Sequence, residues 1–208
     1  MKFYLSSLRI GNNPKDLLKL VGKNKNTAYI SNALDYTADL DRRRFMEEKD
    51  MGELRRNGFE VEKIELRQFF FKEKELEDKL KNFGLIWVRG GNEFVLRQAM
   101  KLSGLDIILK KFKEEKVSIV YGGYGAGVTI IGPTLKGIEL IEDIEQKPYL
   151  ALKYTIWEGL NLIDYQIVPH HDIKNPSVSA MNELIEYYEQ NKISYKTLKD
   201  GEVIIIKK

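Results

Sequence analysis

Residues 120–127 read Val-Tyr-Gly-Gly-Tyr-Gly-Ala-Gly, an apolar run followed at once by small residues. This is the pattern of a nucleophile elbow, a sharp turn from a buried strand into a helix that places one side chain in a pocket beside backbone N–H donors. The central position of such an elbow carries serine in a hydrolase, and here it is Gly125. The sequence therefore predicts the frame of an elbow without its nucleophile.

Composition limits the class of protein. The chain has 208 residues, 43% of them hydrophobic, which is enough for a full core, and one domain over residues 1–208 is the expectation. The net charge is only +3, and the charges are interspersed along amphipathic segments such as Arg42 to Arg56 and Lys72 to Lys81. That distribution favours solvated helix faces over nucleic-acid binding.

The composition also excludes cysteine-dependent sites and argues against a membrane or secreted protein. The chain has no cysteine, which removes disulfides, thiolate metal sites and a cysteine nucleophile. No apolar run reaches the roughly 18 residues that a membrane span needs, and residues Met1 to Ile10 lack the features of a secretion signal. We therefore expect a soluble cytoplasmic protein that binds neither nucleic acid nor membrane.

Strand and helix patterns alternate along the chain, as they do around a parallel sheet. The predicted strands are Lys2 to Ser6, Thr27 to Ser31, Glu60 to Leu66, Leu85 to Val88 and Val117 to Tyr121. The predicted helices run from Pro14 to Gly22, Leu40 to Asn57, Glu73 to Asn82, Asn92 to Gly104, Leu105 to Glu115 and Ala126 to Ile131.

The C-terminal part reads differently. Tyr165 to Val168 is a predicted strand and Ser177 to Gln190 a predicted helix. Ser194 to Leu198 and Val203 to Ile206 are expected to form a closing hairpin, turned at Asp200-Gly201.

Ligands of an open α/β sheet bind beyond the carboxyl ends of its strands, so the residues after each strand are candidates for the site. One such junction is Arg89-Gly90-Gly91-Asn92, between a strand and a helix. Glycines let backbone approach a substrate, and N–H groups at a helix start favour a negative oxygen. A tight turn also needs glycine for steric reasons, so a purely structural role stays open.

The two histidines of the chain, His170 and His171, follow a late strand and Pro169. A histidine there is a candidate general base, with a polar surface turn as the alternative. The run His170-His171-Asp172 also suggests a metal site. Neighbours in an extended segment point to opposite sides, however, and no further histidine or cysteine completes a ligand set, so we expect no metal.

Together these junctions, in this order, resemble the peptidase E family, serine hydrolases with a fold like that of class I glutamine amidotransferases. The resembling residues are Gly90-Gly91-Asn92, Gly123-Tyr124-Gly125-Ala126-Gly127 with Pro133, and Gly159-Leu160-Asn161-Leu162 leading to Pro169-His170. The resemblance covers most of the chain. It implies an α/β three-layer sandwich with a mostly parallel central sheet, flavodoxin-like, and no cofactor.

In that family the elbow serine attacks the scissile carbonyl and the histidine after the proline takes its proton. Carried over by position, the nucleophile maps to Gly125 and the base to His170. The N–H groups of Gly91 and Ala126 map to the oxyanion hole, the pair of donors that binds the negatively charged oxygen of the intermediate.

The acid of the triad is expected in the loop after the elbow. In one plausible alignment with the family, Leu140 occupies the position of this acid and cannot serve as one. Glu142 is therefore the candidate, with Glu139 and Asp143 as alternatives.

Candidate substrate-binding residues are Gly90, Asn92, Tyr124 and Arg89. Arg89 is near enough to the glycine turn to pair with an acidic substrate, and Arg97 is a further candidate for that role.

Glycine has no group that can form an acyl intermediate, so a covalent serine mechanism is not available at Gly125. Tyr124 is a poor substitute, because an unperturbed phenol has a pKa near 10 and its oxygen lies far from the backbone. Thr129 is expected to point away from the elbow. His170 activating water directly is the remaining catalytic route.

Three functions stay open at this point. The first is a peptidase E-like hydrolase, whose family cleaves short peptides with an N-terminal aspartate, here inactive or weakly active. The second is a binding or sensor protein that holds a small acidic peptide or amino-acid derivative. The third is a structural subunit of a homodimer or heteromer. Fold does not choose among them.

Overall fold

A six-stranded sheet forms the centre of the computed structural model, which describes residues 1–172 and 178–207. Its strand order is β3-β2-β4-β5-β1-β8, parallel throughout except for β8, which runs antiparallel to β1. The strands are β1 (Lys2–Ser6), β2 (Asn26–Ile30), β3 (Glu60–Lys63), β4 (Leu85–Val88), β5 (Val120–Tyr124) and β8 (Val203–Ile206).

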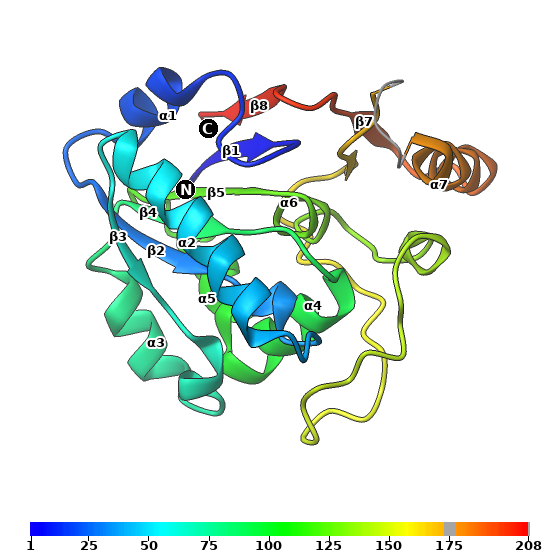
Figure 1. The fold of residues 1–208 in the computed structure, drawn as a ribbon, viewed down its shortest axis with the longest axis horizontal. Helices are drawn as coiled ribbons and strands as arrows, with labels where there is room; N and C mark the ends of the chain where they lie inside the picture. Colours follow the sequence, from blue (N-terminus) through cyan, green and yellow to red (C-terminus); the bar gives the residue numbers. More distant parts are fainter. Residues whose placement is uncertain (173–177, 208) are drawn as a thin grey trace.

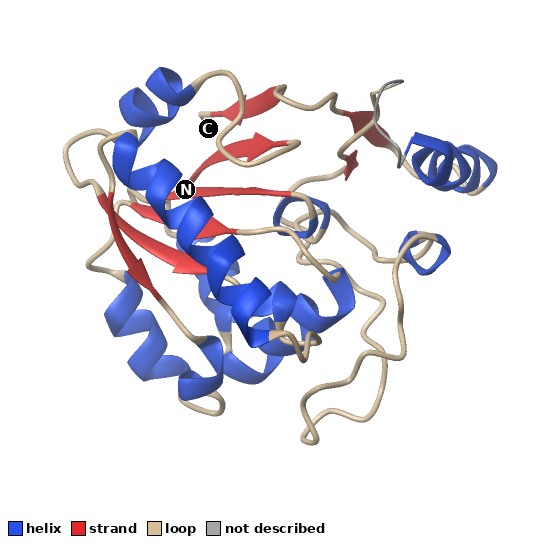
Figure 2. Cartoon of the chain, viewed as in Figure 1, coloured by secondary structure: helices blue, strands red, loops and turns tan. Residues whose placement is uncertain are grey.

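Helices cover both faces of this sheet (Figures 1 and 2). They are α1 (Pro14–Val21), α2 (Leu40–Arg56), α3 (Glu73–Leu80), α4 (Glu93–Ser103), α5 (Leu105–Glu114), α6 (Ala126–Thr129) and α7 (Val178–Gln190), with short 3₁₀ turns η1 (Asn32–Leu34), η2 (Leu66–Phe69) and η3 (Ile138–Leu140). Within the described part of the chain, no helix combines the length and the apolar character that a bilayer crossing demands.

Successive side chains along each strand point to opposite faces of the sheet, so the core is divided into two layers. In β4, Leu85 and Trp87 pack with α1 and α2, whereas Ile86 and Val88 pack with α3, α4 and α5. Strands buried on both faces are typical of a parallel sheet between helical layers. The predicted three-layer α/β sandwich with a mostly parallel central sheet is therefore confirmed.

β3 and β5 differ from the sequence prediction by several residues, whereas the other strands match it to within one residue at each end. β3 ends at Lys63 because the chain turns there into η2. β5 begins at Val120 and continues to Tyr124, beyond the predicted end at Tyr121, because both of its glycines pair with neighbours. Gly122 lies opposite Tyr4 and Trp87, and Gly123 lies opposite Leu5 and Val88. Pairing on both sides outweighs the weak strand preference of glycine.

The predicted closing hairpin is wrong. β7 (Tyr195–Thr197) pairs parallel with β6 (Gln166–Val168) in a small sheet of its own, and β8 joins the edge of the main sheet beside β1. Asp200-Gly201 therefore connects two sheets instead of two paired strands, and Figure 1 shows β7 beside α7, away from the central strands. Ser177, the predicted start of the last helix, lies outside the described residues.

Candidate active site

Gly125 joins β5 to α6 in the backbone conformation of an elbow. Its φ of 54° and ψ of −125° lie where residues with a side chain are strained. A Cβ atom built on it would lie 3.1 Å from Cα of Gly90 and 3.9 Å from Nε2 of His170. A serine hydroxyl, one bond further out, would lie within reach of that imidazole. The frame of the elbow is present, and its empty position faces the histidine.

His170 is held on its other side by Asp200. Nδ1 of His170 lies 2.7 Å from Oδ1 of Asp200, and the backbone N–H of His170 donates to Oγ of Ser7 at 2.8 Å. Oγ of Ser7 in turn donates to Oδ1 of Asp200 at 3.0 Å. His170 has a φ of 58°, so these contacts hold it in the left-handed region. The arrangement leaves Nε2 directed toward Gly125.

Asp200, not Glu142, is the carboxylate bonded to His170. Glu142 instead accepts from Nδ2 of Asn92 at 3.3 Å, and Oε2 of Glu139 accepts from the N–H of Gly137 at 2.6 Å. Oδ1 of Asp143 accepts from the N–H of Glu145 at 2.8 Å. The carboxylate bonded to His170 lies on the link between the two sheets, and not in the loop after the elbow where the sequence predicted it.

The two expected oxyanion donors are available. Among the described residues, the N–H groups of Gly91 and Ala126 enter no backbone hydrogen bond, and both residues line the same cavity as Gly125 and His170. The φ of Gly91 is 146°, and a Cβ atom there would lie 2.5 Å from the carbonyl oxygen of Ala33. Only glycine fits this turn.

Asn92 has a structural role that its sequence position did not reveal. Its Oδ1 accepts from the N–H of Val95 at 2.9 Å, which caps α4. Its Nδ2 donates to Glu142 and, at 2.9 Å, to the carbonyl of Asp143. Asn92 therefore ties the start of α4 to the loop after η3. These contacts occupy the polar groups that were predicted to bind substrate.

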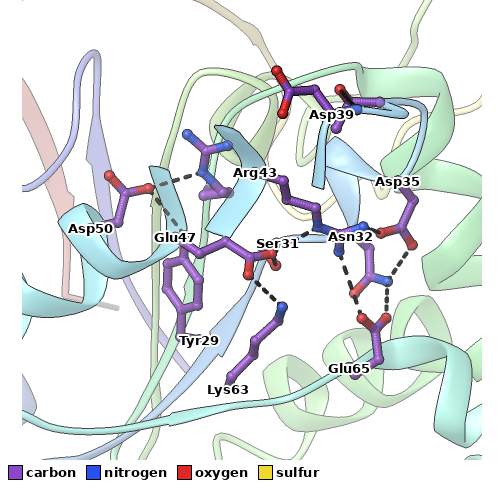
Figure 3. Close-up of polar contacts among 12 residues, drawn as sticks. Tyr29, Ser31, Asn32, Asp35, Asp39, Arg43, Glu47, Asp50, Lys63 and Glu65 are labelled. Atoms are coloured by element: carbon purple, nitrogen blue, oxygen red, sulfur yellow. Dashed lines mark hydrogen bonds and ion pairs between the residues drawn. The ribbon is translucent and has the colours of Figure 1, made fainter. Parts of the chain in front are cut away.

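Arg89 and Tyr124 converge on a buried carboxylate. Nε of Arg89 lies 2.9 Å from Oδ2 of Asp50 and 3.1 Å from the hydroxyl of Tyr124, which also donates to Asp50. Tyr29 donates to the same oxygen at 3.1 Å (Figure 3). Burial and the Asp50 carboxylate raise the pKa of Tyr124, against the opposing effect of Arg89. The Tyr124 phenol therefore stays protonated and is no nucleophile.

Arg97 does not reach the glycine turn. Its Nη1 lies 3.0 Å from Oδ2 of Asp106, and its Nε donates to the carbonyl of Glu158 at 2.9 Å. Its predicted role in binding an acidic substrate is wrong, because these partners bury it within the helical layer.

Helix α2 carries a second cluster of polar side chains on its inner face. The charge pattern of this helix predicted that these side chains face solvent. Figure 3 shows Glu47 between Ser31, Arg43 and Lys63. Its carboxylate accepts from Oγ of Ser31 at 2.6 Å, Nε of Arg43 at 2.9 Å and Nζ of Lys63 at 2.5 Å. These contacts lower the pKa of Glu47 even though burial opposes them. They fix α2 to the carboxyl end of β2, beside the site.

These elements enclose a cavity of about 780 Å³. One wall comes from α2 and the loop after β1, and includes Arg9, Arg42, Phe45 and Lys49. The other comes from α4, the loop around η3, and α7. Gly90, Tyr124 and Arg89 line the cavity as expected, whereas Asn92 does not. Thr129, expected to point away, also lines it, and its hydroxyl donates to the Gly125 carbonyl at 3.2 Å.

The sequence is similar to known peptidases. It matches an uncharacterized peptidase of Pasteurella multocida with 31% identity over 114 residues, 55% of this chain and 52% of the relative. It matches another from Listeria monocytogenes with 32% identity over 99 residues, 47% of this chain and 45% of the relative. The chain spans about half the length of the curated relatives it matches.

Solved structures extend the likeness over the whole fold. A provisionally assigned peptidase E protein from Listeria monocytogenes superposes with a TM-score of 0.71 at 22% identity, covering 98% of this chain and 96% of that one. A peptidase from an acI-B1 Actinobacterium gives a TM-score of 0.70 at 12% identity, covering 98% and 82%. The family model for peptidase family S51 matches residues 9–208. The chain belongs to peptidase family S51, and its fold is that of peptidase E.

Proposed function

We propose that this protein keeps the pocket of a peptidase E-like hydrolase and lacks normal serine-hydrolase turnover. The observation that carries the proposal is the pairing of His170 with Gly125. Nε2 of the imidazole lies 3.9 Å from the position of a Cβ atom that the chain does not have. A base is in place, and the hydroxyl that it would activate is missing.

The loss of the hydroxyl removes the acylation route, because no other group at the elbow can take its place. Tyr124 is held by Asp50 and Arg89, and the Thr129 hydroxyl is directed to the Gly125 carbonyl. His170 and the N–H groups of Gly91 and Ala126 could still act on water. Serine proteases that lack a triad member retain about 10³- to 10⁴-fold catalysis over water, which sets the upper level expected here.

The second candidate function is binding of a small peptide or amino-acid derivative, as a sensor or a sequestering protein. The cavity of about 780 Å³ falls within the size range of small-molecule sites. Its lining holds charges of both signs, with Arg9 and Lys49 on one wall and Glu93 and Glu142 on the other. A pocket kept without its nucleophile favours binding over chemistry.

Two measurements on the purified chain test the proposal. Hydrolysis of Asp-Xaa dipeptides is expected to stay far below a serine-hydrolase rate. Robust turnover that survives His170→Ala contradicts the proposed site. In a thermal-shift assay, a dipeptide at 100 times its Kd stabilises the protein by about 2.7 kcal/mol. The binding function fails if no dipeptide, acidic or neutral, raises the melting temperature.

A further inference from the structure

Glu93 is a buried carboxylate on the cavity wall that lacks a counter-charge. It is the first residue of α4 and is 5% exposed, and it lines the cavity with Gly125 and His170. Among the described residues, its Oε2 has no hydrogen-bond partner. Burying an unpaired carboxylate is costly, so such groups normally have a partner.

Unlike Glu93, the other buried carboxylates of the described chain have a counter-charge. Each has an arginine or lysine within ion-pair distance: Glu47 with Arg43 and Lys63, Asp50 with Arg89, Glu77 with Lys111, and Asp106 with Arg97. No such pair is present for Glu93 in the described residues. This buried carboxylate therefore differs from those that hold the fold together.

Glu142 places a second carboxylate on the same wall. It is half-buried, lines the cavity and is held by Nδ2 of Asn92 at 3.3 Å. Burial raises the pKa of Glu142 to about 7, with Asn92 opposing the shift and Asp143 adding to it. Burial, and then the Glu142 carboxylate, raise the pKa of Glu93 well above its ordinary value. The two carboxylates repel each other, and a cation between them would relieve that repulsion.

The acidic pair lies close to the elbow. The Thr129 hydroxyl donates to the Gly125 carbonyl at 3.2 Å, and Glu93, Gly125 and Thr129 line the same cavity. A ligand whose reacting group lies over Gly125 can therefore reach Glu93 with a neighbouring group.

We propose that Glu93 and Glu142 form a subsite for the ammonium group of the ligand. The inference rests on the proposed function, because it assigns a ligand group to one wall of the same cavity. An ammonium group has three N–H donors and a full positive charge, which matches the unpartnered Oε2 of Glu93 and the adjacent Glu142. A divalent metal fits less well, since the described residues contain no group of three or more acidic or histidine ligands.

The opposite wall supports the same orientation of a ligand. Arg9 and Lys49 line it, on elements that cover the other face of the sheet, and Nη1 of Arg89 is buried there without a hydrogen-bond partner in the described chain. A ligand with an ammonium group at Glu93 and a carboxylate at these cations would span the elbow. Dipeptides and amino-acid derivatives have that charge pattern.

Two sources can supply the ammonium group, a peptide N-terminus or a lysine side chain. Calorimetry on the wild-type chain with three probes separates them: Ala-Leu, N-acetyl-Ala-Leu and N-acetyl-Lys-Leu. For a peptide N-terminus, acetylation of Ala-Leu is expected to weaken binding about tenfold or more. For a lysine side chain, N-acetyl-Lys-Leu is the probe that binds. Both cases support the subsite.

Glu93→Gln and Glu142→Gln identify the residues responsible. Each is expected to weaken the ammonium-bearing probe about tenfold and to leave N-acetyl-Ala-Leu unchanged. Glu145→Gln is the matched control, because Glu145 is an exposed carboxylate of the same loop and does not line the cavity. Unchanged affinity of the ammonium probe in both variants overturns the subsite.

A probe that is not a peptide separates this inference from the proposed function. Carboxyl ¹³C NMR follows the titration of Glu142 in ethylammonium chloride against sodium chloride at equal ionic strength. A lower titration midpoint in ethylammonium supports the subsite, even where no dipeptide binds and the proposed function fails. An identical midpoint in both salts overturns it.

Discussion

Nδ1 of His170 lies 2.7 Å from a carboxylate oxygen of Asp200, across a sequence separation of 30 residues. With Nδ1 engaged, the other ring nitrogen faces the vacant side-chain position of Gly125. The imidazole thus lies between a carboxylate and the vacant position, which is the arrangement of acid, base and nucleophile in a serine hydrolase, around a residue that has no hydroxyl.

Asp200 is expected to control the reactivity of a restored serine. In a Gly125→Ser background, Asp200→Asn should slow labelling by a fluorophosphonate by up to about 10⁴-fold, because the imidazole loses the group that sets its tautomer and orientation. Labelling is followed by mass spectrometry over time. Asp143→Asn is the matched control, since Asp143 bonds the N–H of Glu145 and not His170. Equal labelling rates in the two variants would show that Asp200 has no part in the site.

A side chain at position 125 is expected to strain the backbone of the elbow. Both Gly125→Ala and Gly125→Ser place a Cβ atom at a φ of 54° and 3.1 Å from Cα of Gly90. Each should lower the free energy of unfolding by about 1–3 kcal/mol, and by similar amounts, because the cost comes from the backbone and not from the hydroxyl. Denaturant titration measures the free energy of unfolding of each variant. Variants as stable as the wild type would mean that the elbow relaxes.

Glu47 is expected to anchor the inner face of α2. Glu47→Ala leaves Ser31, Arg43 and Lys63 without their shared acceptor and should cost about 1–3 kcal/mol, since Arg43 keeps its buried pair with Asp35 at 2.5 Å. Asp41→Ala, which breaks the exposed pair of Arg44 and Asp41, should change stability by less than about 1 kcal/mol. Similar costs in urea unfolding would contradict a structural role for Glu47.

The carboxyl groups of Glu93 and Glu142 are expected to make folding stability depend on pH. The raised pKa values of Glu93 and Glu142 mean that the folded state favours the protonated pair, while the unfolded chain ionises near the ordinary value of 4.5. Folding stability contributed by this pair is therefore lost as pH rises from about 4.5 to about 7. Asn92, which also faces Glu142, carries no charge, and hydrogen bonds from Glu145 and Gln146 lower the pKa of Asp143, so Asp143 stays ionised over that range.

Melting temperatures of the wild type and Glu93→Gln test this from pH 5 to pH 8. The variant should gain stability relative to the wild type as pH rises, because it removes a carboxylate that is costly to ionise. Parallel curves at all pH values would show that Glu93 does not titrate in this way.

Features that depend on neighbours in the chain could be predicted from the sequence. The elbow and the glycine turn at Gly91 are local, because their small residues permit backbone conformations that others do not. The position of His170 after a strand followed from the same reasoning. Asn92 was correctly placed at a helix start, but its side chain is used as a cap and as a tie to the loop.

Features that depend on contacts between distant segments could not be predicted from the sequence. Ser7 and Asp200 reach His170 because β8 joins β1 at the sheet edge, and an Asp-Gly pair in sequence predicts a hairpin turn equally well. Charged residues along α2 predict a solvated face, and burial of Glu47 follows only from its contacts with Ser31 and Lys63. Contacts between segments far apart in the sequence therefore decide both the partners of His170 and the burial of Glu47.

Fluorophosphonate labelling of the wild type, Gly125→Ala and Gly125→Ser distinguishes a site that lacks only its nucleophile from one that has also lost its base or oxyanion donors. We expect no label at residue 125 in the wild type or the alanine variant, and a covalent adduct on the serine variant that is lost when His170→Ala is added. A serine variant that folds and resists labelling would contradict an intact base and oxyanion hole, and a wild-type chain that reacts within the cavity would contradict the missing nucleophile.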